Sequence, residues 1–433
     1  MSGDSEQVHG VDTTGVPRRN FLRYTLIGAG CLGTASLLKT YFSAALKEEG
    51  PADIFKGDAP SEQVWEAWKK RGWTREAMHY LKLGKNVQCK ICPNNCLLEP
   101  GDRSHCRNKI NRDGVLYTMA YGNPCSINVD PVEKKPLFHF LPGSRTFSLA
   151  TSGCVFRCLN CQNWEISQKK PEETKTATGP EFRLKFPDPG PITLTQLQNL
   201  SLFPEDITEA SVSMKCPSVS YTYSEPTSYY EYMLDSCKAN RSRHIKNILV
   251  SCGSIEERPL RELAPLIDAA HIDLKGFDEN TYQKLNSGKL QPILNTLKVL
   301  KEMGVWVEVI NLVVPQYTDN LDSIRRMCDW LLNNLGQDQV IHFSRFFPQH
   351  KLTQLPPTPL DQLVQAQKIA KGQGLRFAYI GNARELPDAE TTYCPSCKKA
   401  IIEREVFRVT QIKLSKGQCA YCQTTIPGIW TTS

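Results

Sequence analysis

Three closely spaced cysteines are the residues of this chain best suited to chemistry. Cys154, Cys158 and Cys161 follow a C-x3-C-x2-C pattern within one short segment. A cubane 4Fe–4S cluster normally takes four cysteine thiolates. Three thiolates so close together can hold three of the irons and leave the fourth open to a small molecule. The spacing therefore predicts an iron–sulfur cluster with one free coordination position, whose thiolates must be deprotonated to bind iron.

The other cysteines also gather in groups, and close spacing in a large chain indicates metal rather than disulfide bonds. The sequence contains 17 cysteines. Two further groups hold four cysteines each: Cys89, Cys92, Cys96 and Cys106 in one, and Cys394, Cys397, Cys419 and Cys422 in the other. The cysteines outside the groups are expected to be small buried hydrophobic residues. They are Cys31, Cys125, Cys216, Cys237, Cys252 and Cys328.

The first of these groups lies in a Cys-rich segment, residues 87–146. Its spacing is C-x2-C-x3-C-x9-C, interleaved with proline, glycine and asparagine. Such a stretch has too few apolar residues for a core of its own, and a bound metal would supply the missing stabilisation. A tetrahedral zinc is the simpler interpretation, and a second iron–sulfur cluster is the alternative.

The second group lies in residues 387–433, where two C-x2-C knuckles stand between short runs that favour strands. This arrangement predicts a zinc-ribbon-like segment with a closed site of four thiolates for one structural zinc ion. A rubredoxin-like iron site uses similar knuckles and is the alternative.

The amino-terminal residues 1–46 resemble a twin-arginine export signal. The pair Arg18-Arg19 precedes Phe21 and a mildly apolar stretch. That stretch is short for a membrane span, so no stable span is predicted. The signal suggests export to the periplasm or the cell envelope, whereas chemistry that needs low-potential electrons suggests the cytoplasm.

The rest of the chain supplies the elements that must position these residues. Residues 47–86 are expected to form a helical leader, with helices at 61–71 and 74–83. Residues 147–386 alternate runs typical of strands with runs typical of helices, which predicts an α/β domain, a partial (β/α)6 barrel. Chemistry then belongs at the carboxyl ends of the strands, and the first cysteine motif directly follows the first expected strand.

The expected strands are 146–150, 210–223, 248–251, 271–274, 305–314, 340–346 and 376–380. The expected helices between them are 227–238, 260–269, 290–303, 321–335 and 360–371. The segment 168–200, rich in lysine, glutamate, proline and threonine, is expected to be an inserted surface loop.

Several longer segments resemble one branch of a known superfamily. They are AYGNPCSINVDPVEKKPLFHFLPGS (120–144), GCVFRCLNCQNWEIS (153–167), SYTYSEPTSYYEYM (220–233), HIDLKGF (271–277), VVPQYTDN (313–320), HFSRFFPQHKL (342–352) and YIGN (379–382). Together they resemble the radical S-adenosylmethionine (SAM) enzymes. The branch is the radical SAM member of the AmmeMemoRadiSam group, itself similar to pyruvate formate-lyase activating enzymes.

The resemblance implies a 4Fe–4S cluster whose open iron chelates SAM, and whose electron cleaves SAM to a 5′-deoxyadenosyl radical. It also implies a low-potential electron donor and a small-molecule or protein substrate from which hydrogen is abstracted. An activating enzyme for a glycyl radical enzyme is one alternative, and an electron-transfer iron–sulfur protein is a second. The net charge of +7 is small for 433 residues and predicts no nucleic-acid partner.

The resemblance further implies roles for residues near the ends of expected strands. Glu225 takes the place of the glutamate that binds the SAM ammonium, a strong charge-assisted pairing. Asp273 and Lys275 lie on one face of a short strand and match an Asp-Leu-Lys sequence that contacts SAM. Glu308 and Asn311, on the next strand, are expected either to contact the ribose or carboxylate of SAM or to be core residues.

His342, Arg345 and His350, near a later strand, are candidates for a substrate contact. Two departures from the superfamily pattern concern the nucleotide contacts. Asn160 stands before the third cysteine, where an aromatic or apolar residue is usual, and Tyr223-Ser224-Glu225-Pro226 replaces the usual Gly-Gly-Glu sequence.

Overall fold

The computed structural model of the protein describes residues 56–178 and 200–431. The predicted export signal lies outside the described residues, as do Cys31 and most of the expected surface loop at 168–200. Among the helices that the structure describes, none combines the length and the apolar character that a membrane span requires.

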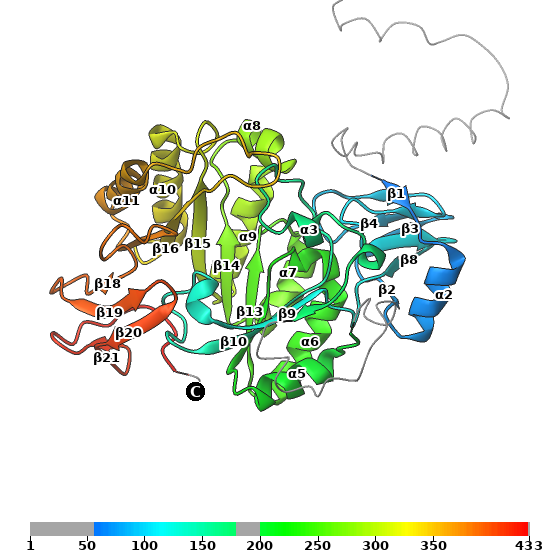
Figure 1. Cartoon of the computed structure of the whole chain (residues 1–433), viewed down its shortest axis with the longest axis horizontal. Coiled ribbons are helices and arrows are strands. Elements are labelled where there is room, and N and C mark those ends of the chain that lie inside the picture. The colour runs from blue at the N-terminus through cyan, green and yellow to red at the C-terminus, as the bar shows by residue number, and fades with distance from the viewer. Residues whose placement is uncertain (1–55, 179–199, 432–433) are drawn as a thin grey trace, which may run out of the picture. The chain divides into compact units, whose positions relative to one another are not determined.

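A nine-stranded sheet carries most of the described chain, in the order β11-β9-β10-β12-β13-β14-β15-β16-β17 (Figure 1). Its strands are β9 (Ser126–Pro131), β10 (Arg145–Ala150), β11 (Ala177–Thr178), β12 (Ser218–Tyr221), β13 (Lys246–Ser251), β14 (Ala269–Asp273), β15 (Trp306–Val313), β16 (Val340–Arg345) and β17 (Phe377–Gly381). Neighbours from β10 to β17 are parallel, and β9 runs antiparallel to β10. Within the described residues the order has two ends, so the sheet is open.

Helices connect the parallel strands, which confirms the expected α/β fold. The helices are α3 (Trp164–Ser167), α5 (Pro204–Ser213), α6 (Tyr230–Ser242), α7 (Glu257–Leu263), α8 (Glu279–Thr281), α9 (Leu290–Glu302), α10 (Leu321–Leu335) and α11 (Leu360–Gln373). Short 3-10 turns occur at η1 (Val132–Lys134), η2 (Pro171–Glu173), η3 (Pro226–Tyr229) and η4 (Ala264–Leu266), and η5 (Tyr282–Asn286) is a π-helix.

Helix α10 illustrates how the local sequence sets these helices. Asn320 caps its start, because the side-chain oxygen accepts a hydrogen bond from the backbone N–H of Ser323 at 2.9 Å. Gly336, with φ of 92°, follows its last residue. The buried face repeats at helical spacing and consists of Ile324, Met327, Cys328, Leu331 and Leu335.

Two expected elements of the core are corrected. The expected strand 210–223 begins inside α5, because Pro204 fixes the first turn of a helix whose start also carries Glu205 and Asp206. Only its end forms a strand, β12. The expected helix 260–269 ends early, since Pro265 lies in a 3-10 turn and β14 already begins at Ala269.

Small antiparallel sheets build the amino-terminal part. One has the order β1-β6-β7-β8-β2, with β1 (Gly57–Asp58), β2 (Arg75–Glu76), β6 (Asp102–Arg103), β7 (Lys109–Arg112) and β8 (Val115–Thr118). The other is β3 (Tyr80–Leu83), β4 (Asn86–Cys89) and β5 (Leu97–Leu98). Helix α2 (Glu62–Lys70) confirms the first expected leader helix. The second, 74–83, is wrong: β3 and β4 pair across a turn at Gly84, whose φ of +70° suits glycine.

The carboxy-terminal tail, residues 387–431, packs against the last two strands of the main sheet. Its strands are β18 (Thr392–Tyr393), β19 (Ala400–Glu405), β20 (Arg408–Ile412), β21 (Leu414–Ser415) and β22 (Gln418–Cys419). Ile401 and Ile426 of the tail share a buried cluster with Val340 and Phe377. The Cys-rich amino-terminal segment instead joins the main core, because Val87 and Leu98 belong to the same cluster as the sheet.

Candidate active site

The cysteine motif lies in the loop that leaves the carboxyl end of β10. Gly153 opens this loop with φ of +87°, and an added Cβ would collide with the backbone oxygen of Cys106. Only glycine fits this approach. Further along, Arg157 holds the loop by donating to the carbonyl oxygens of Cys154 at 3.0 Å and Phe156 at 2.8 Å. The motif is therefore held by the close approach of Gly153 to Cys106 and by the side chain of Arg157.

Each thiol of the motif has one hydrogen-bond neighbour. The backbone N–H of Phe156 donates to the Cys154 sulfur at 3.3 Å. The Asn286 side chain donates to the Cys158 sulfur at 3.2 Å, and the Ser167 hydroxyl lies 3.2 Å from the Cys161 sulfur. Hydrogen bonds to sulfur suit thiolates that bind an iron–sulfur cluster, because they stabilise the charge and tune the potential. The donor set therefore fits such a cluster.

All three cysteines line one cavity of about 530 Å³. Its wall also includes residues at the carboxyl ends of β12 to β17, such as Glu225, Ser251, Asp273, Ser344 and Gly381. The cavity therefore occupies the position that the sequence predicts for chemistry, at the edge of the sheet where parallel strands end. Asn160, which departs from the superfamily pattern, also lies in this wall.

Glu225 is buried in this wall, with its carboxylate fixed by neighbours from two strand ends. One oxygen accepts from the Ser251 hydroxyl at 2.7 Å, and from the backbone N–H and hydroxyl of Thr227 at 3.1 and 2.8 Å. The other accepts from the backbone N–H of Cys252 at 2.9 Å. The four donors hold a carboxylate in place at the cavity and leave its side chain little freedom.

Asp273 and Lys275 form an ion pair of 2.8 Å in the same wall. The ring of His271 adds a contact of 2.9 Å to Asp273. Burial alone would raise the pKa of Asp273, but the charge of Lys275 and the hydrogen bond from His271 outweigh it and lower that pKa. Burial likewise opposes the charge on Lys275, yet Asp273 raises the pKa of Lys275 well above its usual range. Both groups are therefore charged at neutral pH.

Glu308 is fully buried and does not itself line the cavity. Its carboxylate accepts from the backbone N–H of Phe138 at 3.0 Å and of His139 at 2.7 Å, and it contacts His342 at 2.7 Å. Burial would raise the pKa of Glu308, but its partners, His342 foremost, lower it to about 2. Asn311 donates to the carbonyl of Leu274 at 2.8 Å, also outside this wall. The contacts of both residues are those of core residues.

The three candidates for a substrate contact lie in different places. His342 lines the cavity but is bound to Glu308. Arg345 lies outside the wall, where it pairs with Glu385 at 2.9 Å. His350 stacks on Trp164 with ring centres 5.3 Å apart. Of the three, only His342 therefore borders the cavity.

A buried charged group in the wall was not singled out from the sequence. Lys135 contacts Asp130 at 2.7 Å and lies 4.3 Å from the centre of the Tyr223 ring, whose hydroxyl also donates to Asp130. Burial lowers the pKa of Lys135 to about 8 despite the attraction of Asp130. Tyr223 holds a positive φ of 64°, which is uncommon for a residue of this size. The available signal was the pair Lys134-Lys135 directly before the mostly apolar run PLFHF.

A second cavity of about 580 Å³ adjoins the first, between the loop after β17 and the hairpin of β19 and β20. Asn382, Glu390 and Phe407 line both cavities. Burial raises the pKa of Glu390 to about 7, although the charges of Arg404 and Arg384 partly oppose the rise. The tail therefore contributes to the wall of the candidate site.

One peptide segment joins the site to the tail. Phe138 and His139, whose N–H groups bind Glu308, offer their carbonyl oxygens to Arg404 at 2.6 Å and to the N–H of Ile429 at 2.8 Å. The His139 ring contacts the Pro427 carbonyl at 2.7 Å. Burial lowers the pKa of His139 to about 4, so its ring is neutral near pH 7.

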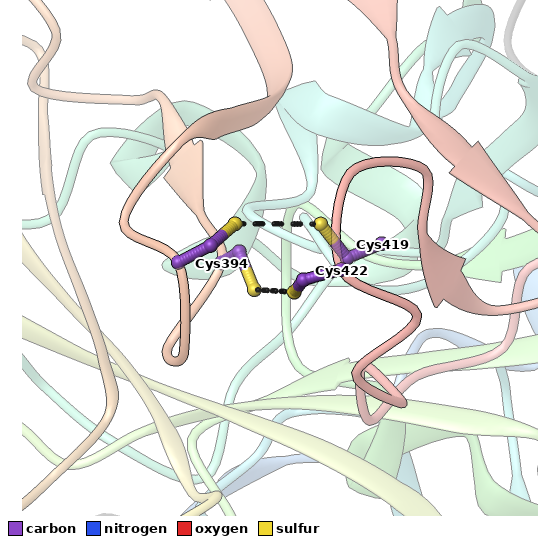
Figure 2. A group of neighbouring side chains, drawn as sticks. Cys394, Cys419 and Cys422 are labelled. Atoms are coloured by element: carbon purple, nitrogen blue, oxygen red, sulfur yellow. Dashed lines mark hydrogen bonds between the residues drawn. The ribbon is translucent and has the colours of Figure 1, made fainter.

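The tail cysteines form a compact group, shown in Figure 2 with the sulfurs of the two knuckles facing one another. The Cys394 and Cys422 sulfurs are 3.6 Å apart, and those of Cys397 and Cys419 are 3.7 Å apart. A Zn–S bond of about 2.3 Å implies sulfurs about 3.8 Å apart at the corners of a tetrahedron. The group therefore has the size of a site for one tetrahedral metal ion.

The first cysteine group, Cys89, Cys92, Cys96 and Cys106, is buried. The other cysteines of the described chain, Cys125, Cys216, Cys237, Cys252 and Cys328, are also buried, as expected.

Comparisons with known proteins bear on this site. Residues 148–331 match the family model described as the radical SAM superfamily. An uncharacterized protein of Methanocaldococcus jannaschii is 41% identical over 351 residues, which cover 80% of this chain and 97% of that one. The pyruvate formate-lyase-activating enzyme of Staphylococcus aureus is 25% identical over 220 residues, covering 49% of this chain and 76% of the enzyme.

Among solved structures, a domain of pyruvate-formate lyase-activating enzyme from Bacteroides vulgatus matches at 19% identity and a TM-score of 0.34. The match covers 38% of this chain and 98% of that domain.

Proposed function

This chain belongs to the radical SAM superfamily, in one family with the Methanocaldococcus jannaschii protein, and from that premise we propose that it cleaves SAM reductively to abstract hydrogen from a substrate. One observation carries the proposal. Cys154, Cys158 and Cys161 line the same cavity as Glu225 and the Asp273–Lys275 pair, at the carboxyl ends of parallel strands. An electron carrier has no need of such a cavity beside its cluster.

We assign three of the four cluster irons to the three thiols of the motif. When bound, a 4Fe–4S cluster would supply the single electron for the reductive cleavage of SAM. The residues around the motif position its thiols, because Phe156, Asn286 and Ser167 each contact one sulfur. The electron comes from a low-potential donor.

Glu225 is proposed to face the ammonium group of SAM. Its carboxylate is already oriented by four protein donors, so little freedom is lost when the cation binds. A carboxylate and an ammonium in a partly dry cavity form a strong charge-assisted pair. Asp273 and Lys275 are proposed to contact the polar parts of SAM from the carboxyl end of β14.

The substrate is proposed to enter from the side of the tail. The second cavity meets the first at Asn382, Glu390 and Phe407. A substrate in this position would cover the radical and exclude water and oxygen from it. In the tail itself, we propose one structural zinc ion held by the four cysteines.

The decisive experiment measures 5′-deoxyadenosine. The protein is reconstituted with iron and sulfide without oxygen and is given SAM and dithionite. We expect turnover in the wild type, none above background in Cys158→Ala, and normal turnover in the matched control Cys328→Ala, whose buried thiol lies on α10. Absence of turnover in a wild type with an intact cluster would favour the electron-transfer alternative.

A second candidate function is activation of a glycyl radical enzyme, which the similarity to the Staphylococcus aureus activating enzyme favours. A glycyl radical enzyme encoded beside this gene would then be the substrate. Mixing that partner with the reduced protein and SAM should produce a glycyl signal in electron paramagnetic resonance (EPR). If no such partner is encoded there and no co-purifying protein gives the signal, the substrate is a different protein or a small molecule.

A further inference from the structure

The first cysteine group is buried beside the candidate active site. Its four thiols lie within electrostatic reach of one another. Two of its loops contact the loop of the Cys154 motif directly: the Asn94 side chain donates to the carbonyl of Val155 at 2.9 Å, and Arg157 donates to the carbonyl of His105. The two cysteine groups are therefore neighbours in one core.

The spacing of the thiols separates this group from the tail site. In the part of the chain that the structure describes, only the tail cysteines bring three or more such ligand atoms within 4.8 Å of one another. The first group does not, and neither does the Cys154 motif. A single tetrahedral ion needs sulfurs about 3.8 Å apart. A cubane keeps its thiolates farther apart, because each of them binds a different iron.

The surroundings also suit a centre that carries four thiolates. Lys109 is 1% exposed and pairs with Glu231 at 2.6 Å, close to Cys89 and Cys106. The Ser104 hydroxyl lies 3.2 Å from the Cys106 sulfur. The ammonium of Lys109 favours a thiolate at Cys89, an effect that Glu231 partly offsets. Hydrogen bonds to sulfur also stabilise an anionic cluster.

We propose that Cys89, Cys92, Cys96 and Cys106 hold a second 4Fe–4S cluster, bound by four thiolates, beside the Cys154 motif. Every iron of this cluster has a protein ligand, so it has no open position for SAM. The proposal concerns a different centre from the one assigned to SAM cleavage and does not depend on that activity.

The first test removes the other cluster. A variant with Cys154→Ala, Cys158→Ala and Cys161→Ala is reconstituted anaerobically and analysed for iron, sulfide and zinc. We expect iron to fall from about eight to about four per chain, with the sulfide falling in parallel. The remaining iron should give an EPR signal on reduction that SAM does not alter. The further changes Cys89→Ala and Cys106→Ala should then remove that iron, whereas Cys328→Ala should not.

The second test needs no variant. Reduced wild-type protein should show two cluster signals, of which SAM alters only one. About four irons and two zinc ions per chain, with a single cluster signal, would overturn the proposal and assign the first group to zinc. Loss of 5′-deoxyadenosine formation with eight irons present would instead contradict the proposed function and leave the second cluster intact.

Discussion

The Cys154 loop and the tail knuckles use the same side chain in opposite ways. In the loop, three thiols border a cavity of about 530 Å³, and each contacts a neighbour of a different kind. In the tail, four thiols face one another at 3.6 and 3.7 Å. The tail set has no position left for a reactant, whereas the loop leaves one. The comparison separates a cysteine set that we propose serves chemistry from one that we propose stabilises the fold.

The largest effect is expected from a substitution in the cavity beside the Cys154 loop that leaves the three cysteines in place. Glu225→Gln would place its single amide N–H₂ against either the Ser251 or the Cys252 donor and would remove the charge that we propose faces the SAM ammonium. We expect SAM cleavage to fall by roughly 100-fold with the iron content unchanged. The measurement is 5′-deoxyadenosine at several SAM concentrations.

Glu257→Gln, an exposed change on α7, is the matched control and should leave the rate unaltered. Unchanged cleavage in Glu225→Gln would remove Glu225 from the SAM site.

An intermediate effect is expected from removing two cysteines of the tail, which tests whether their metal stabilises the fold. Replacing Cys397 and Cys422 by serine should release about one metal ion per chain and loosen residues 392–426, because a short segment with little core depends on its metal. Metal analysis and hydrogen exchange measure the two effects. The neighbouring exposed change Ser396→Ala should keep the metal.

The cluster of the Cys154 motif should survive that change with its iron and visible absorption. If it were lost as well, the two sites would not be independent. Iron in place of zinc in the wild-type tail would indicate a rubredoxin-like centre.

The smallest effect concerns Glu390, at the boundary between the two regions. Its pKa rises from 4.5 to about 7 in the fold, mainly through burial, so between these values the folded chain binds more protons than the unfolded chain. Stability should therefore fall as the pH rises from 4.5 to 7, by at most about 2 kcal/mol once partial exposure is considered. Thermal unfolding in matched buffers should show a flatter slope in Glu390→Gln than in the control Glu405→Gln. Equal slopes would show that another group titrates there.

Local patterns predicted the cysteine groups and most core strands, since thiol spacing and runs of apolar residues are properties of short segments. Contacts between segments that are distant in the sequence could not be predicted from local patterns. The strand pattern around Glu308 places it on β15, but only the fold brings Phe138, His139 and His342 to its carboxylate. Residues 74–83 favour a helix locally, and pairing with β4 overrides that preference.

The buried position of Lys135 beside Asp130 and Tyr223 could not be predicted from the sequence either, because a lysine in a charged pair is usually solvated. Glu225 and the Asp273–Lys275 pair could be singled out because each follows a strand, and ends of parallel strands meet at one edge.

The segment Phe138–His139 has a consequence for the order in which the protein is completed. This segment leaves the ribosome long before Glu308, Arg404, Pro427 and Ile429, the residues that bind its backbone and ring. Until those residues emerge, its polar groups must stay in water, because burial without partners is costly. Lys134 and Lys135, which directly precede this segment and line the cavity, cannot reach their final positions before it does. A cluster inserted into a nascent chain would therefore enter an incomplete cavity. The cavity wall is completed only after the tail has been synthesised.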